Sequence, residues 1–68
     1  MTSTQSAAFV FSQSVAALAE IAGMHAENQQ RQRSDYSPAY VEEQFAAVID
    51  RYGISHDAVL RIFEEAGP

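Results

Sequence analysis

The sequence predicts an all-α fold, in which a long N-terminal helix is followed by a helix-turn-helix-like helical hairpin, assembled as a two-fold dimer. Apolar residues recur every three or four positions in three separate segments. Serine, threonine and proline stand where these segments begin, and no segment alternates in the manner of a β-strand. With 68 residues and no internal repeat, the chain is expected to form one small helical domain, residues 1–68.

The first helix is expected from about Thr4 to Arg33. Thr2 is a suitable N-cap, and Gln5 follows it at the spacing of a capping box. Only Gly23 weakens the helix that follows. An amphipathic stripe at spacings of four, three, four and three comprises Phe11, Val15, Leu18, Ala22 and His25. A second apolar line beside it comprises Ala17, Ile21 and Met24.

The second and third helices are shorter. Ser37-Pro38 predicts a helix start, because serine caps free amides and proline is accepted in the first turn. Gly53 is expected to end this helix, and Ser55 to cap the next. The inward apolar residues are Val41, Phe45, Val48 and Tyr52 on the second helix, and Val59, Ile62, Phe63 and Ala66 on the third. A glycine-containing turn between two such helices is typical of a helix-turn-helix.

Helix length predicts the dimer. The first helix would be about 45 Å long, whereas the other two would be about 22 Å and 17 Å. One copy of the short helices cannot cover every apolar residue of the long one. A two-fold dimer is the commonest way to bury such a surface. Its expected interface consists of Phe9, Phe11, Val15, Leu18, Ala22 and His25.

Charge is concentrated in the second half of the chain. Residues 34–68 hold seven acidic and two basic residues, which accounts for the whole net charge of −5, and the chain has no lysine. A duplex-binding protein needs several cations to displace counterions from phosphates, so direct nucleic-acid binding is not expected. The outward residues of the third helix are His56, Asp57, Arg61, Glu64 and Glu65. They form either a solubilising surface or one that meets a basic patch on another protein.

Several chemistries are not expected. The chain has no cysteine, which excludes thiol catalysis and cysteine-ligated zinc and fits a cytoplasmic protein. His56 and Asp57 are adjacent, so on a helix they point about 100° apart and form no tight metal pair. No glycine-rich phosphate loop and no nucleophile elbow is present. We expect no enzyme activity, no cofactor and no metal.

The apolar segment from Ala7 to Met24 is not expected to be a signal peptide or a membrane span. No basic residue precedes it, whereas a signal peptide has a positive start. Ser12, Gln13 and Glu20 interrupt it, and a spanning helix needs about 20 mostly apolar residues.

Tyrosine and arginine are over-represented at interface hot spots, and both occur in the segment RQRSDYSPAY. Two interpretations remain open, because Tyr40 and Tyr52 could instead pack the hairpin while Arg31 and Arg33 favour the C-terminal dipole of the first helix. The predicted partner-binding residues are Tyr36, Tyr40, Arg51, Asp57, Arg61, Glu64 and Glu65.

In length, in its long first helix and in the hairpin SPAYVEEQFAAVIDRYGISHDAVLRIFEEAG, the chain resembles the small acidic early proteins that bacteriophages use against host regulators. It is similar in particular to the phage quorum-sensing anti-activators, which are dimeric helical proteins. The resemblance implies binding to the DNA-contacting region of a LuxR-type activator, and to a second host target such as a pilus-assembly ATPase. It carries over no functional residue.

The sequence therefore favours a protein-binding inhibitor or modulator, most naturally an anti-activator that binds a host transcription factor through an acidic helical surface. The alternative is a small helix-turn-helix DNA-binding regulator, in which His56, Arg61 and the QQRQR segment would contact phosphates. A purely structural role leaves no distinguishing mark in the sequence.

Overall fold

A computed structural model describes residues 1–65 and confirms the all-helical fold. The long N-terminal helix α1 spans Ser3–Arg33. The hairpin that follows consists of α2 (Glu42–Arg51) and α3 (His56–Glu65). Residues 1–65 contain no strand.

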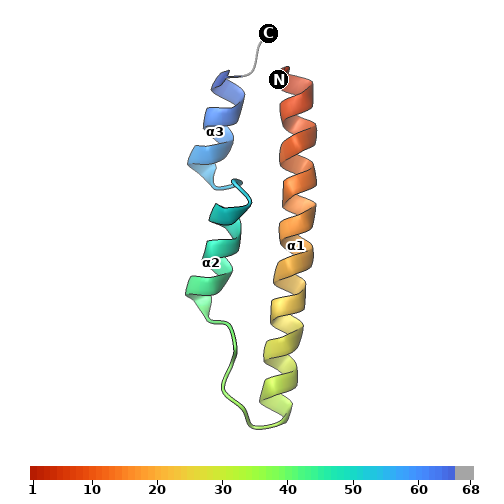
Figure 1. Cartoon of the computed structure of the whole chain (residues 1–68), viewed down its shortest axis with the longest axis vertical. Coiled ribbons are helices and arrows are strands. Elements are labelled where there is room, and N and C mark those ends of the chain that lie inside the picture. The colour runs from red at the N-terminus through yellow and green to blue at the C-terminus, as the bar shows by residue number, and fades with distance from the viewer. Residues whose placement is uncertain (66–68) are drawn as a thin grey trace.

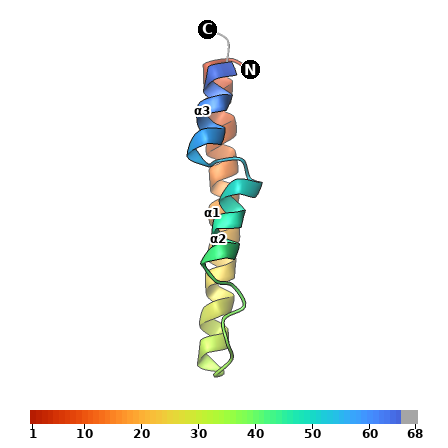
Figure 2. The same ribbon diagram turned by 90° about the vertical axis from the view of Figure 1, so that its left-hand side faces the viewer.

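The two short helices follow one another along one side of α1 and run antiparallel to it (Figures 1 and 2). The α2–α3 hairpin is thus opened out along α1, and each of its helices packs against α1. We call residues 42–65 the arm. The chain forms a rod of 54 × 17 × 11 Å, about one helix thick in its shortest direction.

Local hydrogen bonds define both ends of α1. The hydroxyl of Thr2 accepts from the backbone N–H of Gln5 (3.1 Å), and the side-chain oxygen of Gln5 accepts from the N–H of Thr2 (2.9 Å). The predicted capping box is therefore confirmed. At the other end, the N–H of Tyr36 donates to the carbonyl of Arg31 (2.8 Å), and Asp35 adopts the left-handed conformation with φ of +60°. This is a Schellman motif, in which glycine more often takes the left-handed position.

The start of α2 differs from the prediction. The sequence places it at Pro38, whereas the helix begins at Glu42 with Val41 as its N-cap. The backbone of Tyr40 is engaged by α1, because Asn28 Oδ1 accepts from its N–H (3.0 Å) and Asn28 Nδ2 donates to its carbonyl (2.7 Å). A helix through Tyr40 would need that carbonyl for its own ladder. The side chain of Asn28 therefore favours the later start.

A second Schellman motif joins α2 to α3. The N–H of Ile54 donates to the carbonyl of Ile49 (3.2 Å), and Gly53 lies between them with φ of +69°. The hydroxyl of Ser55 then accepts from the N–H of Ala58 (3.3 Å). Both predictions, the stop at glycine and the serine cap, are confirmed.

We predict that Gly53→Ala lowers the free energy of unfolding by about 1–2 kcal/mol. A Cβ at this position would meet no atom within 4 Å, so the cost comes from the positive φ and not from a clash. Asp35→Gly is the matched change, because it places glycine at the equivalent position of the other motif, and it should raise stability by up to about 1 kcal/mol. Urea unfolding followed by circular dichroism measures both. Equal stabilities in the two variants would contradict the conformational explanation.

The hydrophobic core is small and lies between α1 and α2. Ala17 and Val48 are each 1% exposed and Met24 is 8% exposed. Partly buried apolar residues around them are Ile21, Tyr40, Phe45, Tyr52 and Ile54. The second apolar line of α1 is therefore the one that faces the arm. No residue of α3 is fully buried, and Ala66, expected on its inner face, lies outside the described residues.

Candidate functional site

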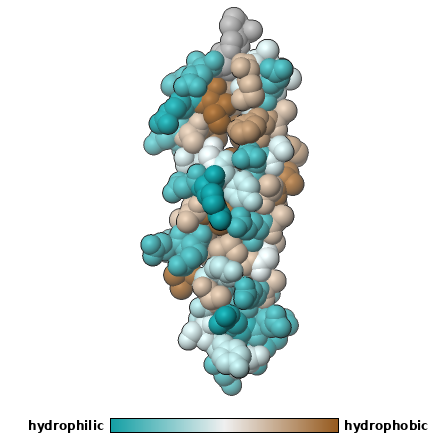
Figure 3. Space-filling view, viewed as in Figure 1, coloured by the Kyte–Doolittle hydropathy of each residue, from teal (hydrophilic) through white to brown (hydrophobic). Residues whose placement is uncertain are grey.

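Six exposed carboxylates are distributed along the arm, and hydrophilic side chains gather at its edge in Figure 3. They are Glu42, Glu43, Asp50, Asp57, Glu64 and Glu65, and we call them the acidic surface. The ion pairs within residues 1–65 join Arg31 to Glu27 and Arg51 to Glu20. Neither pair includes a residue of the acidic surface, so none of its six carboxylates forms an ion pair within residues 1–65.

The position of Glu64 and Glu65 is unfavourable for α3 itself. Its last turn contains no basic residue, and carboxylates at the negative end of a helix cost a few tenths of a kcal/mol each. By contrast, α1 carries Arg31 and Arg33 in its last turn, which is the favourable arrangement. Helix stability therefore does not explain the acids at the end of α3.

Arg51 links the arm to α1. Its guanidinium Nη2 donates to Glu20 Oε1 (2.8 Å), and its Cζ lies 6.0 Å from the centroid of the Tyr52 ring. The Arg51 side chain is 62% exposed, so an ion pair of this kind contributes at most about 1 kcal/mol to stability. Its remaining donors are accessible to a partner.

The Glu20 carboxylate also raises the pKa of Tyr52 above its ordinary value of 10.0. The largest cause is the hydrogen bond between the phenol and this carboxylate; desolvation and the negative charge act in the same direction, and Arg51 opposes them. A raised folded-state pKa means that the stabilisation is present below the ordinary pKa and is lost as pH rises through the raised one.

We predict that Glu20→Gln lowers the pKa of Tyr52 toward its ordinary value, because the substitution removes the negative charge beside the phenol. An absorbance titration of the phenolate measures the shift, and Tyr52→Phe identifies which of the three tyrosines gives rise to it. An unchanged titration of Tyr52 in the Glu20→Gln variant would contradict this assignment.

Three predicted partner-binding residues meet at one hollow of about 280 Å³ between the N-terminal half of α1 and the arm. They are Arg51, Arg61 and Glu65, and the hollow also contains the apolar side chains of Phe9 and Ile62. It can therefore accept an apolar side chain of a partner next to a charged or polar group. Phe9 lies here, 43% exposed, although the sequence placed it in a dimer interface with Phe11.

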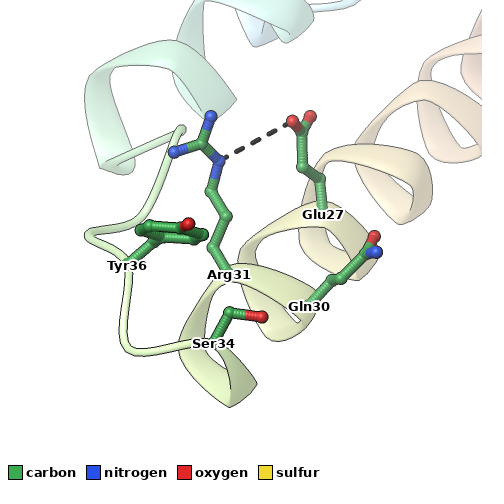
Figure 4. A pocket seen from close by; sticks show the side chains of 5 residues that line it. All are labelled: Glu27, Gln30, Arg31, Ser34 and Tyr36. Atoms are coloured by element: carbon green, nitrogen blue, oxygen red, sulfur yellow. Dashed lines mark ion pairs between the residues drawn. The ribbon is translucent and has the colours of Figure 1, made fainter.

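The two predicted tyrosines lie near the loop between α1 and α2, at the opposite end of the rod from α3 (Figure 1). Tyr36 is 67% exposed and lies beside Arg31 in a hollow of about 410 Å³ (Figure 4). Tyr40 is half-buried and packs edge-on against Phe45, with ring centroids 6.5 Å apart. This agrees with the interpretation in which Tyr40 packs the hairpin. The predicted partner-binding residues thus form two separate groups.

The amphipathic stripe of α1 is exposed. Residues at spacings of three and four share one side of a helix, and this side faces away from the line that packs on the arm. It comprises Ala8, Phe11, Val15, Leu18, Ala22 and His25, which we call the outer face of α1. Phe11 and Leu18 are 72% and 66% exposed. No part of residues 1–65 covers the outer face of α1.

By length and composition alone, α1 is also apolar enough to cross a membrane. Buried core helices of soluble proteins and N-terminal signal sequences meet the same criterion. The arm packs against one side of α1, and Glu20 forms its ion pair there with Arg51.

Three polar side chains of α1 hold the arm and the loop before it, and local sequence patterns give none of them this role. Besides Asn28 and Glu20, Gln13 donates from Nε2 to the backbone carbonyl of Tyr52 (3.2 Å). Their spacings of seven and eight residues place them on the same side of the helix as Ala17. That periodicity is the signal by which they could have been identified.

Within residues 1–65, no group of three or more histidine, aspartate or glutamate side chains lies close enough to hold a metal ion. Among known proteins, the chain matches no protein-family model, no curated protein and no solved structure. The candidate site is therefore interpreted from the geometry of the chain.

Proposed function

We propose that the chain is a protein-binding inhibitor whose acidic surface contacts a basic face of another protein, and that this face is the DNA-contacting region of a transcription activator. The observation that carries the proposal is the exposure of six arm carboxylates with no ion-pair partner in residues 1–65.

Charge complementarity favours this class of partner. An acidic surface whose carboxylates form no ion pairs accelerates encounter with basic proteins and opposes contact with phosphates. The acids at the end of α3 act against the stability of their own helix, which supports a role outside the chain. The hollow at Arg61 and Ile62 adds an apolar contact beside them.

Inhibition would follow from competition. A DNA-binding domain gains most of its non-specific affinity from cations that neutralise phosphates. Carboxylates that occupy those cations remove them from DNA. The activator would then be bound away from its promoter without any chemical change, as an anti-activator requires.

We predict that the triple variant Asp57→Lys, Glu64→Lys, Glu65→Lys loses at least about tenfold in affinity for such a domain. The probe is the isolated DNA-binding domain of a LuxR-type activator, titrated calorimetrically at low and high salt. The matched control is Glu42→Lys, Glu43→Lys, Asp50→Lys, which makes the same charge change on α2. Circular dichroism checks that both variants remain helical.

Selective loss in the α3 variant supports the proposal and locates the contact. Equal losses in both variants would mean that net charge alone attracts the domain, and unchanged affinity in the α3 variant would remove α3 from the contact. If the wild-type chain does not bind this domain at low salt, the choice of target is wrong. A shift of duplex DNA by the wild-type chain would instead favour the helix-turn-helix DNA-binding regulator.

A further inference from the structure

The chain exposes more surface than a compact protein of its mass. Its accessible surface is 5110 Å² at 7.5 kDa, whereas a compact monomer of that mass exposes about 4,250 Å². The excess of about 850 Å² is close to the roughly 800 Å² that each partner buries in a standard protein interface. One further interface of ordinary size would bring the chain to the usual degree of burial.

The outer face of α1 is the surface suited to that interface. Its spacings, three, four, three, four and three, are those of the a and d positions of a coiled coil. The flanking positions hold Ala7, Ser12, Ser14, Ala19, Ile21, Ala26 and Asn28, so no carboxylate or guanidinium borders it. Uncharged flanks allow two helices to pair without burying an unpaired charge.

We propose that the outer face of α1 binds the outer face of a second copy of this chain, with the two helices antiparallel and the two-fold axis between Ala16 and Ala17. In an antiparallel pair, each a residue meets a d residue of the other helix. In this register Ala8 meets His25, Phe11 meets Ala22, and Val15 meets Leu18, each twice. Every layer then combines a larger with a smaller side chain, apart from the central Val15–Leu18 layers, which are of similar size.

The parallel arrangement packs the same residues poorly. Each residue would meet its own copy, so Phe11 would meet Phe11 and Ala22 would meet Ala22. The Phe11–Phe11 layer would be overfilled, and the Ala22–Ala22 layer would leave a void that costs stability. The two His25 side chains would also share a layer. Complementary volumes are therefore available only in the antiparallel register.

A membrane surface fits the outer face less well. Helices that lie on membranes carry lysine and arginine on their polar side. Between Thr2 and Asn28, α1 has no lysine or arginine, and its charged residues there are Glu20 and Glu27. A second copy of the chain is therefore the occupant that charge and spacing favour.

The antiparallel pairing has a consequence for the arms. The outer face and the arm lie on different sides of α1. The two α1 helices would therefore form the centre of the dimer, with one arm packed on the far side of each. The two acidic surfaces then face outward in opposite directions. Such a dimer can bind two basic partners, or two copies of one partner.

The absence of cysteine makes a direct test possible. Four single variants are prepared. Phe11→Cys and Ala22→Cys test one layer, and Val15→Cys and Leu18→Cys test a second. In the antiparallel dimer, a mixture of Phe11→Cys and Ala22→Cys chains forms a mixed disulfide, as does a mixture of Val15→Cys and Leu18→Cys chains. Two Ala22→Cys residues would lie about 16 Å apart along the helix axis, too far for a disulfide.

Light scattering and vesicle sedimentation complete the experiment. We expect a dimer for the wild-type chain and at least a hundredfold weaker dimerisation for Leu18→Glu, whereas the control Ala16→Glu adds the same charge on another side of α1 and remains dimeric. Cross-linking of Ala22→Cys with itself would overturn the antiparallel direction. Two results would overturn the second copy as occupant of the outer face. One is a monomer at all concentrations. The other is sedimentation of the wild-type chain with anionic phospholipid vesicles, if Leu18→Glu abolishes it.

Discussion

Replacing Val48 by aspartate is expected to unfold the chain at neutral pH. Val48 is 1% exposed and is the largest side chain that is fully buried among the described residues. A carboxylate there would be buried without a partner, which costs several kcal/mol unless the region opens. A chain of 68 residues has a total stability of roughly 3–10 kcal/mol. The core has only three buried apolar residues among those described, so no other part of it can offset this loss of stability.

Val41→Asp is the matched control, because it makes the same substitution in the same segment and is expected to stabilise the chain. Val41 is the N-cap of α2, is 54% exposed and provides no side-chain acceptor. Only half of a capping box is present, in which Gln44 Oε1 accepts from the N–H of Val41 (2.9 Å). Aspartate would supply the missing acceptor and gain about 0.5–1 kcal/mol, less some repulsion from Glu42 and Glu43.

Thermal unfolding followed by circular dichroism measures both valine variants. The expected results have opposite signs: loss of the helical signal for Val48→Asp and a higher melting temperature for Val41→Asp. A folded Val48→Asp protein with normal helicity would contradict the packing of α2 against α1.

The Asn28→Ala variant is expected to lose about 2–3 kcal/mol of stability, since two hydrogen bonds disappear and the backbone groups of Tyr40 lose their partners. Asn28→Asp keeps the acceptor for the N–H of Tyr40 but places a carboxylate oxygen against its carbonyl. It should therefore be at least as destabilising as alanine, although its shape is nearly that of asparagine.

Gln29→Ala is the control for Asn28, because Gln29 is the exposed next residue and makes no side-chain hydrogen bond among those of the described chain. Urea unfolding should show a change below about 0.5 kcal/mol for Gln29→Ala. The same small change in Asn28→Ala would mean that the loop is held by Tyr40 and Phe45 packing and not by the asparagine.

The helix boundaries that depend on neighbouring residues were predictable from the sequence. The Thr2 capping box, the glycine at position 53 and the Ser55 cap all act within a few residues of themselves. The start of α2 was not predictable in this way, because the deciding partner, Asn28, is 12 residues from Tyr40 along the chain. Long-range partners leave no local signal.

The two apolar lines of α1 illustrate a second limit. Both have helical spacing, and periodicity alone does not say which one the arm covers. The line that faces the arm contains the small Ala17 and lies beside Gln13, which bonds to the arm backbone, whereas the larger Phe11 and Leu18 are exposed. The acidic surface was predictable from composition. Its separation from Tyr36 was not, because that depends on α2 and α3 lying end to end along α1.

The side-chain hydrogen bonds from α1 to the loop and the arm have a consequence for the order of folding. They join residues separated by 12 positions (Asn28 and Tyr40), 31 positions (Glu20 and Arg51) and 39 positions (Gln13 and Tyr52). Loop-closure entropy grows with the logarithm of this separation, so the last of these hydrogen bonds costs about 1 kcal/mol more than the first if it forms alone. If each forms after the one before it, most of that difference disappears.

The arm is therefore expected to dock onto α1 progressively, from the loop between α1 and α2 toward α3. We expect α3, which has no fully buried residue, to dock last and to detach first. The end of the chain that carries Asp57, Glu64 and Glu65 is thus the part whose docking onto α1 is most easily reversed, while the loop end stays closed.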